Sequence, residues 1–184
     1  MLALHQAGCH TIKFGVESGN QKILDNIQKG TTLKQARDAF KIAREIGIKT
    51  HAHSMLGCIG ETKETLRDTI NFAKEIKPTT VTFNVFTPFS GTPVYDLVIN
   101  ELEKKDVDGT EIDISIEHAQ AYYNNLFTEL TNEDVTKSLR QAYKEFYLRP
   151  SYFFDRIKMI NSFDRLKKDI KSGVAVSSFI FNRQ

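Results

Sequence analysis

Three short polar segments each follow an apolar run of strand length in the amino-acid sequence. They are "ESGN" (17–20), "GCIGET" (57–62) and "TPFSGTP" (87–93). Because glycine, serine, asparagine and proline are common turn formers, any one segment alone is explained as a turn. Three of them after successive strands instead predict a binding site, since the carboxyl ends of parallel strands meet at one rim. Glu17 and Glu61 would both place a carboxylate at this rim.

Two histidines suggest a different chemistry. His51 and His53 lie two residues apart in a predicted strand, so their side chains share one face. Metal-dependent hydrolase barrels use this spacing for their first two ligands. A mononuclear site needs three or four ligands, and His5, His10 and His118 do not follow a strand at the rim. A metal hydrolase is therefore the less favoured alternative, and no metal ligand is assigned.

The sequence contains two cysteines, Cys9 and Cys58. His10 adjoins Cys9, but neighbours on a strand point to opposite faces, so neither thiol has a histidine placed to activate it. Both are interpreted as small buried hydrophobic residues, and no catalytic residue is assigned. Two cysteines are too few for a disulfide framework, which favours a reducing, cytoplasmic location.

Composition and net charge indicate which kinds of partner the chain could bind. Of 184 residues, 40% are hydrophobic and 26% charged, which is typical of a soluble globular protein. A formal net charge of +2 gives no indication of nucleic acid or of an acidic membrane surface as a partner. No apolar run approaches the roughly 18 residues that a bilayer span needs, and no signal peptide is recognisable.

The elements that position the polar segments alternate between strand and helix over the first hundred residues. The predicted strands cover residues 12–16, 49–56 and 81–86. Helices are predicted to begin after Thr31 or Thr32, after residues 60–62, and near Pro93. This alternation predicts parallel β/α crossovers, and hence a doubly wound sheet or a β/α barrel. A short helix that ends at Gly8 leads us to expect a preceding segment.

The second half of the chain has a different residue pattern, which predicts mostly helices. A charged link is followed by a short extended piece at residues 113–115, then by helices from Thr131 and from about Ser151. Their aromatic stripes are expected to cover an open barrel or a neighbouring chain rather than hold a cofactor. We therefore divide the chain into residues 1–98 and residues 99–184.

Residues 7–96, which contain "GVESGN", "MLGCIGET" and "NVFTPFSGTP", resemble the second half of the catalytic barrel of radical S-adenosylmethionine enzymes. The likeness is greatest to the subgroup that often carries an N-terminal cobalamin-binding domain. The tail "QAYKEFYLRPSYFFDRI" (141–157) resembles the helical extension of that subgroup. The resemblance implies an α/β fold: the C-terminal half of an incomplete (β/α)6 barrel, with a mostly α-helical C-terminal extension.

The same resemblance implies a site for S-adenosylmethionine. The first segment would contact the ribose and methionine portion of the nucleotide, and the other two would contact its adenine. The implied cofactor-binding residues are Glu17, Ser18, Gly19, Leu56, Gly57, Val85, Phe86 and Pro88. Gly60 and Glu61 would shape the second loop and cap the next helix. Lys29 could meet the methionine carboxylate, although a solvated lysine at a helix end is the preferred interpretation.

One family feature does not match. Radical enzymes of this kind hold a four-iron–four-sulfur cluster with cysteines spaced C-x3-C-x2-C, whereas Cys9 and Cys58 are 49 residues apart. We therefore expect a C-terminal fragment, inert alone, of a longer enzyme that uses S-adenosylmethionine, the cluster and, in this subgroup, cobalamin for methyl transfer or cyclisation. Its expected partners are a small-molecule substrate and the missing N-terminal half of the barrel. The alternatives are a non-catalytic binding or scaffold module, or the hydrolase that uses His51 and His53.

Overall fold

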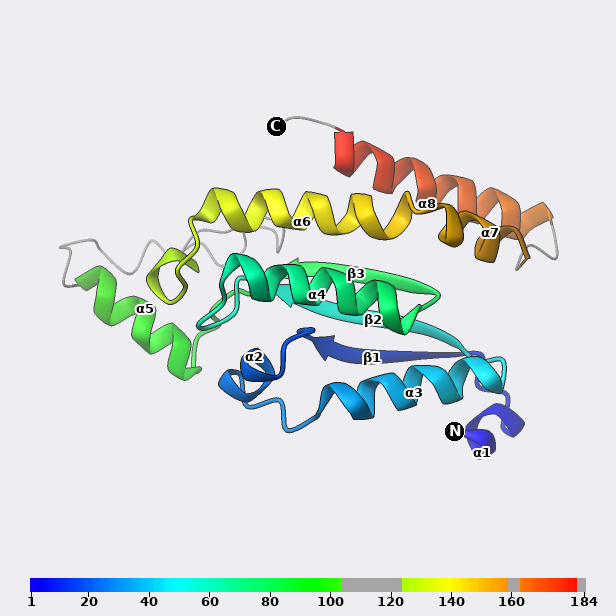
Figure 1. Ribbon diagram of the computed structural model, residues 1–184, viewed down its shortest axis with the longest axis horizontal. Coiled ribbons are helices and arrows are strands. Elements are labelled where there is room, and N and C mark those ends of the chain that lie inside the picture. The colour runs from blue at the N-terminus through cyan, green and yellow to red at the C-terminus, as the bar shows by residue number, and fades with distance from the viewer. Residues whose placement is uncertain (104–123, 159–162, 182–184) are drawn as a thin grey trace.

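The computed structural model of the protein describes residues 1–103, 124–158 and 163–181 (Figure 1). At its centre lies a parallel sheet in the order β1-β2-β3. Its strands are β1 (Thr11–Glu17), β2 (Lys49–Leu56) and β3 (Thr80–Val85). The crossovers between them contain α2 (Gln21–Asn26), α3 (Leu33–Glu45) and α4 (Lys63–Ile76). The predicted α/β class with parallel crossovers is therefore confirmed.

The remaining elements are helical. They are α1 (Leu2–Gln6), α5 (Pro93–Glu103), the 3-10 helix η2 (Asn124–Leu126), α6 (Asn132–Tyr147), α7 (Pro150–Lys158) and α8 (Phe163–Phe181). The predicted extended piece at residues 113–115 and most of the predicted charged link lie outside the described residues. None of the described helices is both long enough and apolar enough to cross a membrane.

The helices begin where threonine side chains cap them. Thr32, Thr62 and Thr131 each accept a hydrogen bond from the backbone N–H three residues later, in complete capping boxes. The expectation that Glu61 caps the helix after β2 is therefore wrong, because Thr62 is the cap of α4.

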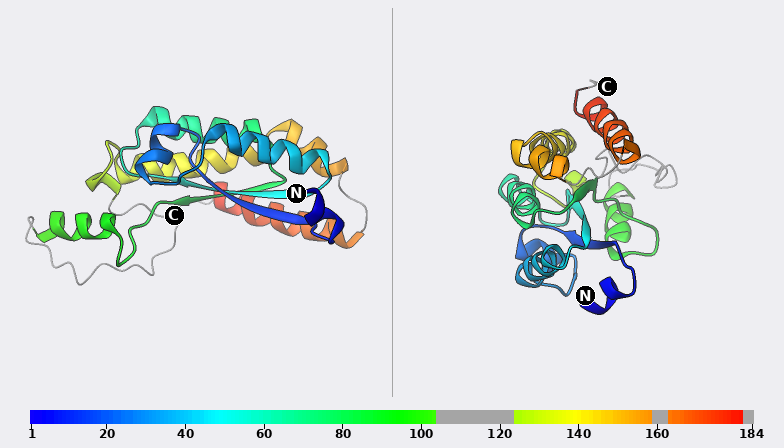
Figure 2. Two further views of the ribbon diagram at one scale, coloured as in Figure 1. Left: turned by 90° about the horizontal axis from the view of Figure 1, so that it is seen from below. Right: turned by 90° about the vertical axis from the view of Figure 1, so that its right-hand side faces the viewer.

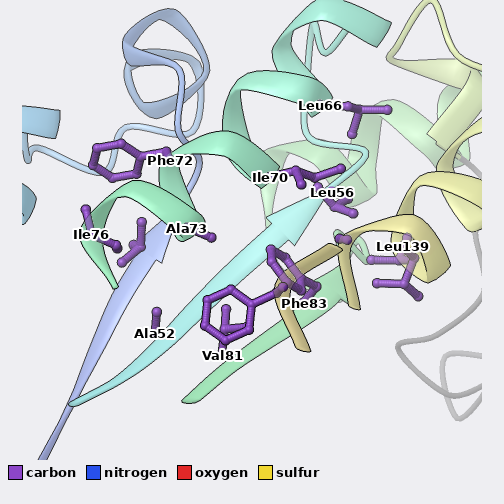
Figure 3. Close-up of a cluster of buried hydrophobic side chains, with 14 of the residues drawn as sticks. Ala52, Leu56, Leu66, Ile70, Phe72, Ala73, Ile76, Val81, Phe83 and Leu139 are labelled. Carbon is purple, nitrogen blue, oxygen red and sulfur yellow. The ribbon is translucent and has the colours of Figure 1, made fainter. Parts of the chain in front are cut away.

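One face of the sheet carries the main hydrophobic core. Figures 1 and 2 show α3, α4 and α6 along this face, while α5 and α8 lie toward the other. Alternate strand residues such as Ala52, Leu56 and Phe83 pack there against α4 side chains (Figure 3). Leu139 of α6 belongs to the same cluster, so the core continues across the predicted division at residue 98, which itself stays a prediction.

The free edge of β3 is covered by the aromatic side of α6. The hydroxyl of Tyr147 accepts a hydrogen bond from Val81 N–H at 3.0 Å and donates one to Val81 C=O at 2.6 Å. The hydroxyl of Tyr143 pairs in the same way with Phe83, at 3.2 Å and 3.1 Å. Two tyrosines thus satisfy the backbone groups that an edge strand would otherwise expose.

Candidate functional site

The loops that follow the three strands lie at one end of the sheet, where the strand arrows point in Figure 1. Beyond the paired strands, Phe86 N–H donates to Leu56 C=O at 2.8 Å, which holds the second and third loops together. The structure therefore brings the three polar segments to a common rim, as their order in the sequence predicted.

Glu17 occupies an unusual position at the end of β1. Its φ of 62° lies in the left-handed region, immediately after a break in the β1–β2 register between Gly15 and Glu17. Non-glycine residues held in this conformation occur preferentially at ligand sites and switch regions. The Glu17 carboxylate forms an ion pair with Lys29, whose Nζ lies 2.8 Å from Oε1. The Glu17 side chain is 16% exposed. Lys29 is thus neither a solvated helix-end lysine nor an unpaired cation.

Gly15 leaves room for this ion pair. A Cβ atom at Gly15 would lie 2.9 Å from Lys29 Nζ and would also collide with the Glu17 carboxylate. The glycine before the polar segment therefore allows the carboxylate to turn over the β1 backbone.

Ser18 and Gly19 are directed into the protein. Ser18 is fully buried, with its Oγ 3.0 Å from Thr69 Oγ1, and Gly19 N–H donates to the same oxygen at 3.0 Å. A Cβ atom on Gly19 would lie 2.5 Å from Asp68 C=O and from Phe72 Cβ, so only glycine fits against α4. Both residues have a structural role here, and their predicted nucleotide contacts stay predictions.

Asn20 has a capping role that sequence reasoning missed. Its Oδ1 accepts from Lys22 N–H at 3.0 Å as the N-cap of α2, and its Nδ2 donates to Asp68 Oδ2 at 2.8 Å. The available signal was an asparagine immediately before a helix-compatible run. The second half of "GVESGN" thus joins β1 to α2 and α4.

A buried carboxylate organises the second loop. Glu61 is fully buried, and its Oε2 accepts hydrogen bonds from Gly57 N–H and, at 2.9 Å, from Cys58 N–H. Its Oε1 is buried and has no hydrogen-bond partner within the part of the chain that the structure describes. Burial raises the pKa of Glu61 to about 7, against the lowering effect of the two backbone donors.

Asn124 joins the second and third loops from outside the predicted barrel segment. Its Nδ2 donates to Gly57 C=O at 2.8 Å and to Phe86 C=O at 2.9 Å, and the residue is 2% exposed. The Phe86 and Phe127 rings meet edge to face, with centroids 5.8 Å apart. No local sequence pattern could have identified this asparagine, because its partners are 38 and 67 residues away.

The predicted adenine-binding residues differ in whether their side chains are exposed at the rim. Leu56 and Val85 direct their side chains into the core, and Gly57 and Pro88 are also buried. Phe86 is partly exposed. The structure therefore brings these residues to the rim mainly as backbone, and their predicted contact with adenine stays a prediction.

The face of the sheet opposite the main core is polar, which the sequence reasoning recognised only for the two histidines. Across the strands, His51 of β2 lies between Lys13 of β1 and Thr80 of β3. His53 likewise lies between Gly15 and Thr82. Met55 and Asn84 form the next pair on the same face. The sequence indicated this polar face, because polar residues recur at alternate positions of the strands. Strands that are buried on both faces are instead continuous apolar runs.

Within this polar face, His51 is held by two threonines. Its ring nitrogens lie 2.7 Å from Thr80 Oγ1 and 3.0 Å from Thr82 Oγ1. Burial, with smaller effects of His53 and Lys13, lowers the pKa of His51 to about 4. Among the described residues, no group of three or more histidine, cysteine, aspartate or glutamate side chains could hold a metal ion. The hydrolase alternative therefore gains no support.

The two cysteines lie at opposite ends of the sheet. Cys9 precedes β1, whereas Cys58 follows β2 and is buried, which raises the pKa of its thiol. The cysteines of this chain therefore do not fit the ligand set of a four-iron–four-sulfur cluster, which needs converging thiolates.

Comparison with known proteins agrees with the arrangement of strands and rim. Residues 1–73 match the family model described as the Radical SAM superfamily. The chain is 35% identical over 153 residues to an uncharacterized methyltransferase of Pyrococcus horikoshii, covering 80% of this chain and 31% of that protein. It is 28% identical over 148 residues to the anaerobic magnesium-protoporphyrin IX monomethyl ester cyclase of Cereibacter sphaeroides, covering 80% of this chain and 23% of the cyclase.

The chain thus spans a third or less of the length of these relatives. The family match covers β1, β2 and most of α4, which are the elements that position the first two polar loops. The chain belongs to the radical S-adenosylmethionine superfamily.

Proposed function

We propose that the rim binds the adenosyl and methionine parts of S-adenosylmethionine within a longer radical enzyme. The observation that carries this proposal is Glu17, a carboxylate held in a left-handed backbone conformation at the end of β1. Its oxygens can accept hydrogen bonds from a pair of ribose hydroxyls. The backbone at Gly57 and Phe86, tied together by Asn124, would flank the adenine.

The same proposal assigns the iron–sulfur cluster to other segments of the longer protein. In radical enzymes, S-adenosylmethionine bound at such a cluster supplies a 5′-deoxyadenosyl radical. Cys9 and Cys58 do not converge, so this chain would contribute nucleotide binding and not cluster ligation. The names of the relatives support methyl transfer or cyclisation on a small-molecule substrate as the reaction class. Cobalamin as a further cofactor is part of the proposal.

The two edges of the sheet support a larger barrel. Tyr143 and Tyr147 cover the β3 edge, whereas Thr11, Lys13 and Gly15 of β1 are exposed. We propose that β1 pairs with a further parallel strand of the longer protein, as the fourth strand of an incomplete six-stranded β/α barrel. The polar face with His51 and His53 would then line the inside of that barrel.

Substitution of Glu17 in the longer protein tests the nucleotide site. Glu17→Ala should weaken S-adenosylmethionine binding roughly ten- to a hundred-fold, since a charge-assisted hydrogen bond contributes about 1.5–3 kcal/mol. Isothermal titration of the nucleotide measures the affinity, and thermal melting of the apo protein measures stability. Glu45→Ala, which removes an exposed carboxylate at the end of α3, is the matched control and should leave the affinity unchanged.

A Lys29 variant measures how much the ion pair with Glu17 contributes to stability alone. Lys29→Met should lower the melting temperature as much as Glu17→Ala does if the ion pair is only structural. Unchanged nucleotide affinity in Glu17→Ala, beside a lowered melting temperature, would remove Glu17 from the binding site. A helix-capping role could not explain that result, because Asn20 and not Glu17 caps α2.

A further inference from the structure

A second concave site lies at the end of the sheet opposite the rim. A cavity of about 430 Å³ is lined by residues from the starts of β2 and β3, the ends of α3 and α4, and α7. These parts of the fold lie at the right of Figure 1. Its volume lies within the range of about 300–1,000 Å³ that small-molecule sites occupy. Because β2 has eight residues, about 25 Å of strand separates this cavity from the rim.

The cavity is strongly basic. Its charged lining comprises Arg44, Lys49, Lys77, Arg149, Arg156 and one acid, Asp155. Within the described part of the chain, neither Lys49 nor Lys77 forms an ion pair with a carboxylate. Five cations around one acid repel one another, and this repulsion is relieved when an anion enters.

Arg149 is the most informative of these residues. Its guanidinium lies over the Phe146 ring, 4.0 Å from the ring centroid, which fixes the plane of the group. Its Nη1 is buried and has no hydrogen-bond partner among the described residues. A buried donor without an acceptor is costly in a folded protein, so an anion that reached this guanidinium would relieve that cost.

Helix ends explain only part of the arrangement. Carbonyl groups at the ends of α3 and α4 favour nearby cations, and Arg44 Nη1 indeed donates to Ile76 C=O at 3.2 Å. Lys77 is itself the C-cap of α4. Arg149 directly follows the C-cap of α6, and Arg156 lies in the last turn of α7, so helix ends favour these two cations as well. What the helix ends do not explain is that the cations of four separate helices line one cavity together with a single acid.

We propose that this cavity binds a small anion that carries phosphate groups, at a site separate from the S-adenosylmethionine rim. The planar guanidinium groups of Arg149 and Arg156 can each donate paired hydrogen bonds to phosphate oxygens, and Lys49 and Lys77 add two point charges. Ile48 and Pro78 provide an apolar wall on which the rest of such a molecule can lie. The site does not depend on the nucleotide proposal, because it shares no residue with the rim.

Titration of the 184-residue chain with inorganic pyrophosphate, at constant ionic strength, tests this site. Arg149→Met keeps an apolar stem over Phe146 and should weaken pyrophosphate binding roughly tenfold or more. A Lys49→Met and Lys77→Met double variant removes two cations of the lining without touching Arg149, and should also weaken binding even if Arg149→Met does not fold. Lys34→Met, which removes one exposed cation on α3 far from the cavity, is the matched control and should bind as the parent chain does.

Two further ligands test which chemical groups the cavity recognises. Citrate of comparable charge should bind at least several-fold more weakly than pyrophosphate if phosphate geometry is recognised. Adenosine triphosphate should compete with pyrophosphate if the apolar wall accepts a nucleoside. Absence of pyrophosphate binding would overturn the proposal, and so would equal weakening in Lys34→Met or undiminished binding in the double variant.

Discussion

The pH dependence of stability should reveal two groups, Glu61 and His51, that act in opposite directions. Burial raises the pKa of Glu61 from its ordinary 4.5 to about 7. The native state therefore holds the Glu61 proton more tightly than the unfolded chain does. This contribution to stability is complete below pH 4.5 and is lost as the pH rises through 7. The difference in pKa corresponds to at most about 3.4 kcal/mol, of which about 2.5 kcal/mol is lost between pH 5 and pH 8.

His51 contributes with the opposite sign. Its pKa is lowered from 6.5 to about 4, so its contribution is complete above pH 6.5 and is lost as the pH falls toward 4. Because His51 is partly exposed, solvent reduces the effect to about 1 kcal/mol between pH 5 and pH 8. The parent chain should therefore lose only about 1.5 kcal/mol between pH 5 and pH 8, the difference of the two effects.

Two single substitutions separate these contributions. Glu61→Gln preserves an oxygen that can accept from Gly57 and Cys58 but removes the ionisation, so stability should rise by about 1 kcal/mol from pH 5 to pH 8. His51→Gln should instead steepen the loss to about 2.5 kcal/mol. Urea unfolding at pH 5, 6, 7 and 8 gives each slope without requiring equal absolute stabilities. If Glu61→Gln still loses stability as the pH rises, Glu61 is not the group responsible and the reasoning fails.

Three other predictions follow from particular contacts. Gly19→Ala should destabilise the fold by about 1–3 kcal/mol through collision with α4, whereas Gly173→Ala, with open space around it, should not; equal melting temperatures would contradict the packing. Tyr147→Phe should lower the free energy of unfolding by about 1–3 kcal/mol because it leaves both Val81 backbone groups unpaired, and Tyr95→Phe serves as the control for loss of a hydroxyl. Anaerobic reconstitution of this chain with iron and sulfide should yield no stoichiometric cluster, and a four-iron electron paramagnetic signal after reduction would disprove that expectation.

Much of the fold could be predicted because its signals are local. Alternating apolar residues predicted residues 49–56 as a strand, which matches β2. Threonine caps predicted where α3 and α6 begin, whereas α4 was expected after residues 60–62 with the wrong capping residue. The short helix α2 was missed because Asn20 was interpreted as part of a turn or ligand loop, although it is also a good N-cap.

The site was less predictable because its important contacts are distant in sequence. The hydrogen bonds from Asn124 to the second and third loops depend on how the chain returns to the rim after α5. The pairing of Tyr143 and Tyr147 with the β3 edge is equally nonlocal, although their helical spacing predicted a buried aromatic face. The polar face of the sheet could have been recognised from alternation alone, had that pattern been extended beyond the two histidines.

The segment "GVESGN" shows why residue type alone cannot separate a ligand contact from a packing contact. Serine, glycine and asparagine are all suited to nucleotide binding, yet Ser18 and Gly19 meet α4 and Asn20 caps α2. These contacts hold the backbone on both sides of Glu17 and so make its left-handed conformation sustainable. Packing by three neighbours is therefore what keeps one carboxylate at the rim, where Lys29 pairs with it. If the rim binds a nucleotide, the functional part of the segment is a single side chain, and its neighbours act by positioning it.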